Sequence, residues 1–156
     1  MRYDRPHVTD GSSMRTGSVI AFGLMVAGLG ILISTDALWA RRPITIAVQV
    51  AAALLMIAAR VTFGRRSFHA AANPTEGGVV RNGPYAFLRH PIYAAVIYFM
   101  WAAAADHPSL LSFSAATLTT AGAVVRMLLE ERMLVAKYPE YREYMRQTRR
   151  VIPFVL

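Results

Sequence analysis

The chain has 156 residues, of which 55% are hydrophobic, a formal net charge of +8 and no cysteine. Soluble proteins contain roughly 45–50% apolar residues, so this composition argues against a soluble domain and for a membrane protein. The lack of cysteine excludes disulfides, thiolate catalysis and sulfur-ligated metals. Because His7, His69 and His107 also lack the paired spacing of a metal site, we expect no bound metal.

A polar tail over residues 1–16 precedes four apolar stretches that predict membrane helices. The stretches cover residues 17–40, 43–59, 91–105 and 109–129. A helix that crosses a hydrocarbon core about 30 Å thick needs ~20 residues, which the first, second and fourth stretches supply. The sequence therefore predicts an all-α fold: an integral membrane helical bundle of about four transmembrane helices plus a C-terminal amphipathic arm. We divide it into a first hairpin over residues 17–63 and a functional region over residues 64–156.

The first apolar stretch follows Arg2, Arg5 and Arg15, as a cleaved secretion signal would. Its apolar run is about twice the usual length of such a signal, so we expect a retained membrane anchor. Small residues, which we expect to face a neighbouring helix at close contact, are Gly23, Ala27 and Gly30 on this helix and Ala47, Ala51 and Ala58 on the second.

Positive charges are distributed unevenly between the two sides that four spans would define. Of the 17 Lys and Arg residues, only Arg41 and Arg42 fall on one side. Because positively charged segments stay in the cytoplasm, we expect both termini to be cytoplasmic, in a bacterial inner membrane. The net charge is then a topology signal and an attraction to anionic membrane lipids, and no nucleic-acid partner is expected.

The segment between the two hairpins predicts a pocket at the mouth of the third helix. Residues 64–82 form a long loop, and loops of this length tend to cover or line a site. Gly83-Pro84-Tyr85 and Arg89-His90-Pro91-Ile92-Tyr93 follow, and ionisable groups at membrane depth mark functional sites by default. Pro91 suits the first turn of a helix and holds His90 extended before it. We therefore expect residues 83–90 to form a pocket wall.

The turn Asp106-His107-Pro108 is so short that the helices on either side must be antiparallel neighbours. Counting outward from His107 places position 90 opposite position 124, Arg126 opposite Leu88 and Glu130 opposite Pro84. Arg126 and Glu130 are four residues apart and share a helix face, where a plain stabilising ion pair is the alternative to a site. The sixteen residues 110–125 that precede Arg126 carry no charge, which favours a site.

Four separated motifs occur together in an order that resembles a known family. They are Gly83-Pro84-Tyr85, Arg89-His90-Pro91-Ile92-Tyr93, Arg126 with Glu130-Glu131-Arg132-Met133-Leu134, and the tyrosines 138, 141 and 144 with Arg150-Val151-Ile152-Pro153. This set resembles the isoprenylcysteine carboxyl methyltransferase family and the wider phospholipid methyltransferases. The resemblance covers roughly the last 80 residues. It implies a helical membrane enzyme that takes S-adenosylmethionine from the cytoplasm and a lipophilic acceptor, a small molecule or a lipidated one, from the lipid side.

The resemblance also implies a role for each motif residue. The implied cofactor contacts are His90, Tyr93, Tyr85, the backbone around Val80, and the paired acidic residues Glu130 and Glu131. Arg126 and Glu130 are implied to act at the acceptor. These residue types suit the chemistry, because a carboxylate acceptor is already a nucleophile and Arg126 can grip two oxygens. For an amine acceptor, Glu130 could serve as the base.

Several alternatives stay open beside a carboxyl O-methyltransferase. A lipid amine N-methyltransferase is one, and a steroid-reductase-like enzyme that binds NADPH at the same place is another. A non-catalytic membrane module is a third. The C-terminal arm, in which Tyr138-Pro139 opens a short helix, is expected either to close the cofactor pocket or to be a plain membrane-surface helix.

Overall fold

The computed structural model describes residues 11–64 and 79–152, and these residues form helices connected by turns. The elements are α1 (Gly11–Ser34), α2 (Pro43–Phe63), the 3-10 helix η2 (Gly83–Ala86), α3 (Pro91–Asp106), α4 (Leu110–Lys137) and α5 (Tyr141–Gln147). The described part contains no strand, only an isolated parallel bridge between Leu88 and Arg149. The predicted all-α fold is confirmed. Most of the predicted loop, residues 65–78, lies outside the described residues.

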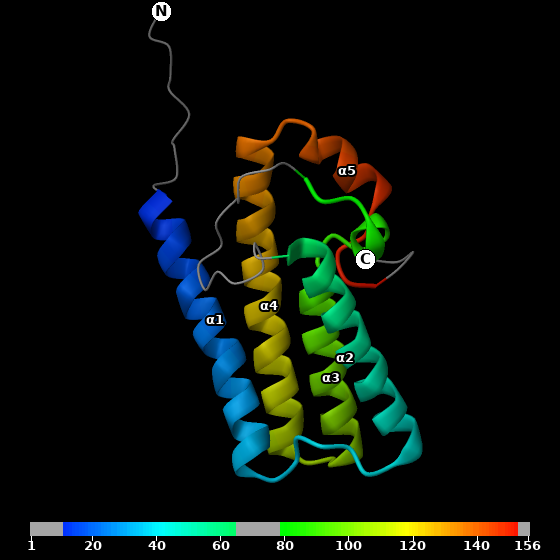
Figure 1. Cartoon of the computed structure of the whole chain (residues 1–156). Coiled ribbons are helices and arrows are strands. Elements are labelled where there is room, and N and C mark those ends of the chain that lie inside the picture. Colours follow the sequence, from blue (N-terminus) through cyan, green and yellow to red (C-terminus); the bar gives the residue numbers. More distant parts are fainter. Residues whose placement is uncertain (1–10, 65–78, 153–156) are drawn as a thin grey trace, which may run out of the picture.

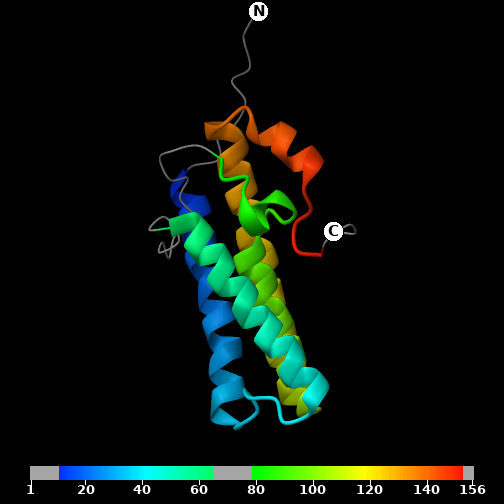
Figure 2. The ribbon, with the colours of Figure 1, turned by 45° about the vertical axis from the view of Figure 1, so that its right-hand side comes forward.

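The four long helices run up and down alternately (Figure 1). Helix α4 packs against both α1 and α3, and α3 packs against α2, so the order across the bundle is α1, α4, α3, α2. The start of α1, the end of α2, η2, the start of α3 and α5 all lie at one end, as the two views agree (Figures 1 and 2). We call this end the η2 end.

Three of the helices, α1, α2 and α4, are long and apolar enough to cross a membrane, and α3 is a shorter apolar helix of 16 residues. At 1.5 Å per residue α3 is about 24 Å long, whereas the 28 residues of α4 extend about 42 Å. Large apolar side chains on α1 and α2 face outward, among them Ile20, Ile44 and Val61, which are 61%, 76% and 76% exposed. Such faces suit a lipid environment, as expected for an integral membrane helical bundle.

The bounds of α1 differ from the predicted stretch at both ends. The helix begins at Gly11, so part of the predicted polar tail is helical. It ends at Ser34 instead of running on to residue 40, because the hydroxyl groups of Ser34 and Thr35 donate to the carbonyl of Ile31 at 2.9 and 2.8 Å. Asp36 then takes a positive φ of 52°, which turns the chain out of the helix.

Helices α1 and α4 approach closely through two glycines that the sequence did not single out. A Cβ atom on Gly28 would lie 2.6 Å from the carbonyl oxygen of Ala115, and one on Gly122 would lie 2.5 Å from that of Ala21. By contrast, a Cβ on Gly23 or Gly30 would meet nothing within 4 Å. The prediction that Gly23 and Gly30 face a neighbouring helix is therefore wrong, because both residues lie on another face of α1.

At the other end of the bundle, Asp106 ties the two hairpins together. Its carboxylate, at the end of α3, accepts hydrogen bonds from the backbone N–H groups of Arg41 and Arg42 at 2.8 and 2.9 Å and from the hydroxyl of Thr45. These groups begin α2, where unpaired N–H groups and the helix dipole favour an anion. Asp106 thus caps a helix that is distant in sequence.

Candidate active site

The predicted meeting of α3 and α4 residues at the η2 end occurs, but the side chains that touch are not the ones that the count from the turn placed opposite each other. Arg126 lies sixteen residues beyond the start of α4, about 24 Å along it, so it reaches the level at which α3 begins. There Arg126 and Glu130 contact Tyr93 rather than Leu88 and Pro84. The side-chain contacts are offset from the counted positions because helical side chains lean toward the N-terminus of their own helix, and antiparallel helices lean in opposite directions.

The centre of the site is a cluster of three side chains, Tyr93, Arg126 and Glu130. The Nε atom of Arg126 donates to the Tyr93 hydroxyl at 2.7 Å, and that hydroxyl donates to Oε1 of Glu130. The Nη2 atom of Arg126 lies 3.5 Å from the same Glu130 oxygen. Arg126 is only 4% exposed, whereas the Glu130 side chain is 23% exposed. Glu130 is therefore the charged member of the cluster that a ligand can reach first.

Helix α1 adds two groups that sequence reasoning missed. The carbonyl oxygen of Ser18 accepts a hydrogen bond from Nη1 of Arg126 at 3.3 Å. The ring of Phe22 lies beside the same guanidinium, with its centroid 5.2 Å from Cζ, which allows a cation–π contact. A backbone carbonyl carries no sequence signal, and Phe22 could not be distinguished from the other apolar residues of the helix.

Glu131 lies in a second cluster, in which its carboxylate is bound by groups of the chain itself. Nε and Nη2 of Arg150 lie 3.2 and 3.0 Å from its Oε2 atom. Nε2 of His90 lies 3.2 Å from its Oε1 atom, and Nε of Arg89 lies 3.4 Å away without hydrogen-bond geometry. The Glu131 side chain is 6% exposed. The cofactor role implied for Glu131 stays a prediction.

The C-terminal arm, residues 138–152, packs on the segment that was expected to form a pocket wall. The Tyr144 hydroxyl donates to the carbonyl oxygen of Tyr85 at 2.7 Å, and burial raises the pKa of Tyr144 to about 12, so this donor keeps its proton. The backbone N–H groups of Arg89 and His90 donate to the carbonyl groups of Arg149 and Arg150 at 2.6 and 3.1 Å. The arm is thus part of the folded η2 end, and that it closes the cofactor pocket stays a prediction.

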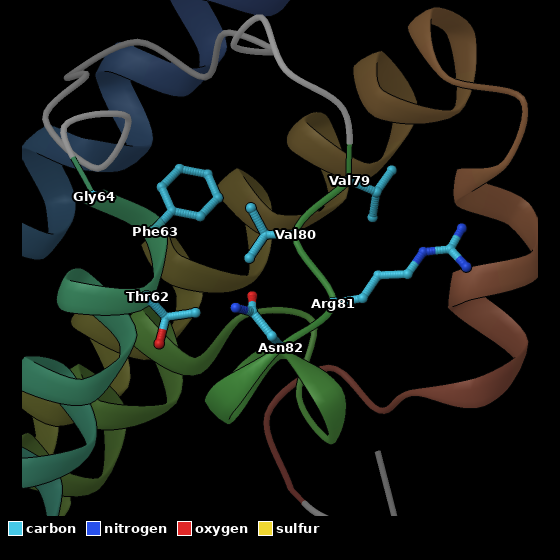
Figure 3. Close-up of a pocket in the computed structure, with 7 residues that line it drawn as sticks. All are labelled: Thr62, Phe63, Gly64, Val79, Val80, Arg81 and Asn82. Atoms are coloured by element: carbon cyan, nitrogen blue, oxygen red, sulfur yellow. The ribbon is translucent and has the colours of Figure 1, made fainter.

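A pocket of about 710 Å³ opens at the same end of the bundle, between the end of α2 and the segment that leads to η2 (Figure 3). It is lined by Thr62, Phe63, Gly64, Val79, Val80, Arg81 and Asn82. The side chains of Phe63 and Val80 point toward each other, and Arg81 points away (Figure 3). Phe63 also packs on Tyr85, with ring centroids 5.4 Å apart. Of the predicted cofactor contacts, Val80 lines this pocket and Tyr85 adjoins it through Phe63.

The other predicted residues, His90, Tyr93 and Glu130, gather at the polar clusters. The His90 and Tyr93 rings are 5.8 Å apart, and Nδ1 of His90 lies 3.8 Å from Oε2 of Glu130. Within the described ranges the structure therefore brings all predicted site residues to the η2 end, in two neighbourhoods. Thr62, Phe63, Ser18 and Phe22 are additions that only the fold reveals.

The helices with outward-facing apolar side chains define an integral membrane protein. The cluster of guanidinium, phenol and carboxylate, together with the pocket at the same end, is an enzyme-like site. The family model described as phospholipid methyltransferase matches residues 18–141, well over half of the chain. The chain belongs to this family, which points to a membrane methyltransferase. The chain has no significant match among the curated proteins or the solved structures. The predicted isoprenylcysteine carboxyl methyltransferase subfamily stays a prediction.

Proposed function

We propose that the chain is an S-adenosylmethionine-dependent methyltransferase that methylates a carboxylate on a lipophilic acceptor. The observation that carries this proposal is the geometry of Arg126. Its Nε atom is fixed by the Tyr93 hydroxyl at 2.7 Å, whereas Nη1 and Nη2 make longer contacts, 3.3 Å to the Ser18 carbonyl and 3.5 Å to Glu130. An acceptor carboxylate would replace these two longer contacts with a bidentate pair.

The side chains of the cluster have separate tasks in this reaction. S-adenosylmethionine supplies a methyl group activated by a sulfonium, and transfer to a carboxylate forms an O–C bond as the S–C bond breaks. Arg126 would hold and orient the acceptor oxygens, and Tyr93 would keep the guanidinium in place. Glu130 would offset the positive charge of the donor. No base is needed, so alignment and exclusion of water are the main contributions of the protein.

The charge balance of the two clusters supports an anionic acceptor. The two clusters contain the guanidinium groups of Arg89, Arg126 and Arg150 against the carboxylates of Glu130 and Glu131. One positive charge is therefore in excess before a cationic donor binds. A carboxylate acceptor lowers this excess, whereas an ammonium group would raise it in a poorly solvated place.

The residues near the pocket fit the proposed cofactor. Its volume of about 710 Å³ lies within the ~300–1,000 Å³ typical of small-molecule sites. The Phe63 and Tyr85 rings offer faces for a planar base, and the Asn82 amide lines the same space. His90, Tyr93 and Glu130, at the same end of the bundle, would face the reacting end of the cofactor.

A lipid amine is the second candidate for the acceptor, because Glu130 is the more accessible member of its pair with Arg126. A lipid ammonium must lose a proton before it can attack, and the 23% exposed Glu130 carboxylate could take that proton. The family description, phospholipid methyltransferase, also agrees with this candidate.

We further propose that the η2 end faces the cytoplasm, with both termini on that side, in a bacterial inner membrane. Arg41 and Arg42 lie at the other end of the bundle, between α1 and α2. Of the other Lys and Arg residues, the eleven in the described ranges lie toward the η2 end, near the start of α1, in the last turn of α2, in the second half of α4, and in residues 81–89 and 142–150. The cofactor would then enter from the cytoplasm and the acceptor from the bilayer.

Two measurements test the proposal. Calorimetric titration of the detergent-purified protein with S-adenosylhomocysteine should show micromolar binding, and NADPH should not bind. If NADPH alone binds, the proposed function changes from a methyltransferase to a reductase. If neither ligand binds, a non-catalytic module is favoured. Incubation with methyl-labelled S-adenosylmethionine and a membrane lipid extract should then label a lipid. Label released as methanol by mild base identifies a methyl ester, whereas base-stable label identifies an N-methylated amine.

A further inference from the structure

The Glu131 carboxylate joins two parts of the chain that are far apart in sequence. Arg150 of the C-terminal arm binds it through two nitrogens, Nε at 3.2 Å and Nη2 at 3.0 Å. His90, at the start of α3, binds it through Nε2 at 3.2 Å. The Glu131 and His90 side chains are 6% and 5% exposed, whereas the Arg150 side chain is 41% exposed, so Arg150 approaches a buried carboxylate from the surface. Charge-assisted, two-point contacts of this kind are strong and fix geometry.

The contact with Glu131 sets the orientation of the His90 ring. An ionised carboxylate can only accept hydrogen bonds, so the Nε2 atom of His90 must carry the hydrogen. The Nδ1 atom then faces Glu130, 3.8 Å from its Oε2 atom. The arm holds the backbone of the same residue, because the carbonyl of Arg150 accepts from the N–H of His90 at 3.1 Å.

We propose that Glu131 and Arg150 form a positioning pair through which the C-terminal arm orients His90 for the cofactor. In this pair Glu131 acts through His90 and does not bind the cofactor itself. The inference rests on the proposed function, because it assigns the pair a role in cofactor binding. It also assigns a role to Arg150. The family model matches residues 18–141, so Arg150 lies beyond the matched part of the chain.

The chain offers a matched control for this pair. Arg146 lies on the same arm, but its side chain is 80% exposed and its pairing is a 3.6 Å contact with Glu143. Arg150→Ala and Arg146→Ala therefore remove the same charge from the same arm, and only the first removes a contact with Glu131. Arg89 remains 3.4 Å from Glu131 in both variants, which limits the loss of stability.

The test is a double-mutant cycle on the affinity for S-adenosylhomocysteine, measured by calorimetry on the full chain. Glu131→Gln and Arg150→Ala should each weaken binding on the order of tenfold, a size typical of residues that orient a direct ligand. The double variant should lose no more than either single variant, because both remove the same interaction. Arg150→Lys should recover part of the affinity, and Arg146→Ala should bind as the unchanged protein does.

The proposal is overturned if Glu131→Gln weakens binding while Arg150→Ala does not, since Glu131 would then contact the cofactor directly. The proposal is also overturned if the loss of affinity for S-adenosylhomocysteine in the double variant equals the product of the losses in the two single variants. If the unchanged protein does not bind S-adenosylhomocysteine, the proposed function fails, and hydrogen exchange still tests the pair. The amides of Arg89 and His90 should then exchange faster in Arg150→Ala than in Arg146→Ala, and equal exchange would overturn the pair.

Discussion

Replacing Tyr93 by phenylalanine removes one oxygen atom that joins two charged groups. That oxygen accepts from Nε of Arg126 at 2.7 Å and donates to Glu130. A hydrogen bond to a charged group is worth about 1.5–3 kcal/mol, and an unpaired buried partner adds to the loss. Arg126 is 4% exposed and cannot recover its bond from water, whereas the partly exposed Glu130 can. We therefore expect Tyr93→Phe to lower the free energy of unfolding by about 3 kcal/mol.

Tyr98→Phe is the matched control on the same helix. The Tyr98 hydroxyl donates to the backbone carbonyl of Val151, an uncharged acceptor. Its loss should lower the free energy of unfolding by about 1 kcal/mol. Unfolding of both variants in mixed SDS and detergent micelles, followed by circular dichroism, measures the difference between the two tyrosines.

The result that would refute this reasoning is an equal loss of stability in the two variants. The Tyr93 hydroxyl would then not hold a buried charged pair, and Arg126 would lack the fixed orientation that the proposed reaction needs. If the reasoning holds, Tyr93→Phe should also lower kcat by about 10–100-fold, because the guanidinium loses the bond that orients it. The retained ring should leave the affinity for S-adenosylhomocysteine within about threefold of the original.

Three further variants test the remaining assignments. Arg126→Ala should lower kcat at least about 100-fold, because it removes the group proposed to bind the acceptor, and S-adenosylhomocysteine affinity measured by calorimetry should stay nearly unchanged. His90→Ala should weaken S-adenosylhomocysteine binding about tenfold, and unchanged affinity would contradict its cofactor role. Asp106→Asn should lower the free energy of unfolding by about 1–2 kcal/mol, because an amide satisfies fewer of the N–H groups at the start of α2. Turnover per folded molecule should not change in Asp106→Asn, since this residue lies at the opposite end of the bundle.

The sequence predicted the main features of the site because a few local rules determine them. The Asp106-His107-Pro108 turn required antiparallel neighbours, and α3 and α4 are such a pair. The spacing of Arg126 and Glu130 placed both on one face, and Pro91 opened the third helix as expected. Counting residues from the turn gave the wrong partners, because the count follows Cα positions and contacts depend on where side chains reach.

Contacts between distant segments could not be predicted in the same way. Asp106 caps α2 from the end of α3, although 64 residues separate it from Arg42. Arg150 reaches Glu131 only because the chain turns after α4 and returns along residues 87–90. Neither contact has a periodicity or a motif of its own, so only the folded chain identifies the partners.

The adjacent residues Glu130 and Glu131 were interpreted as one paired acidic position, but a helix cannot give two neighbours the same surroundings. Successive residues are about 100° apart around an α-helix, so Glu130 faces Tyr93 and Arg126 while Glu131 faces Arg150. The ring of His90 contacts both carboxylates, at 3.8 and 3.2 Å. His90 thus connects the proposed acceptor cluster to the arm. If the arm moved, the His90 ring would move with it and its contact with Glu130 would change.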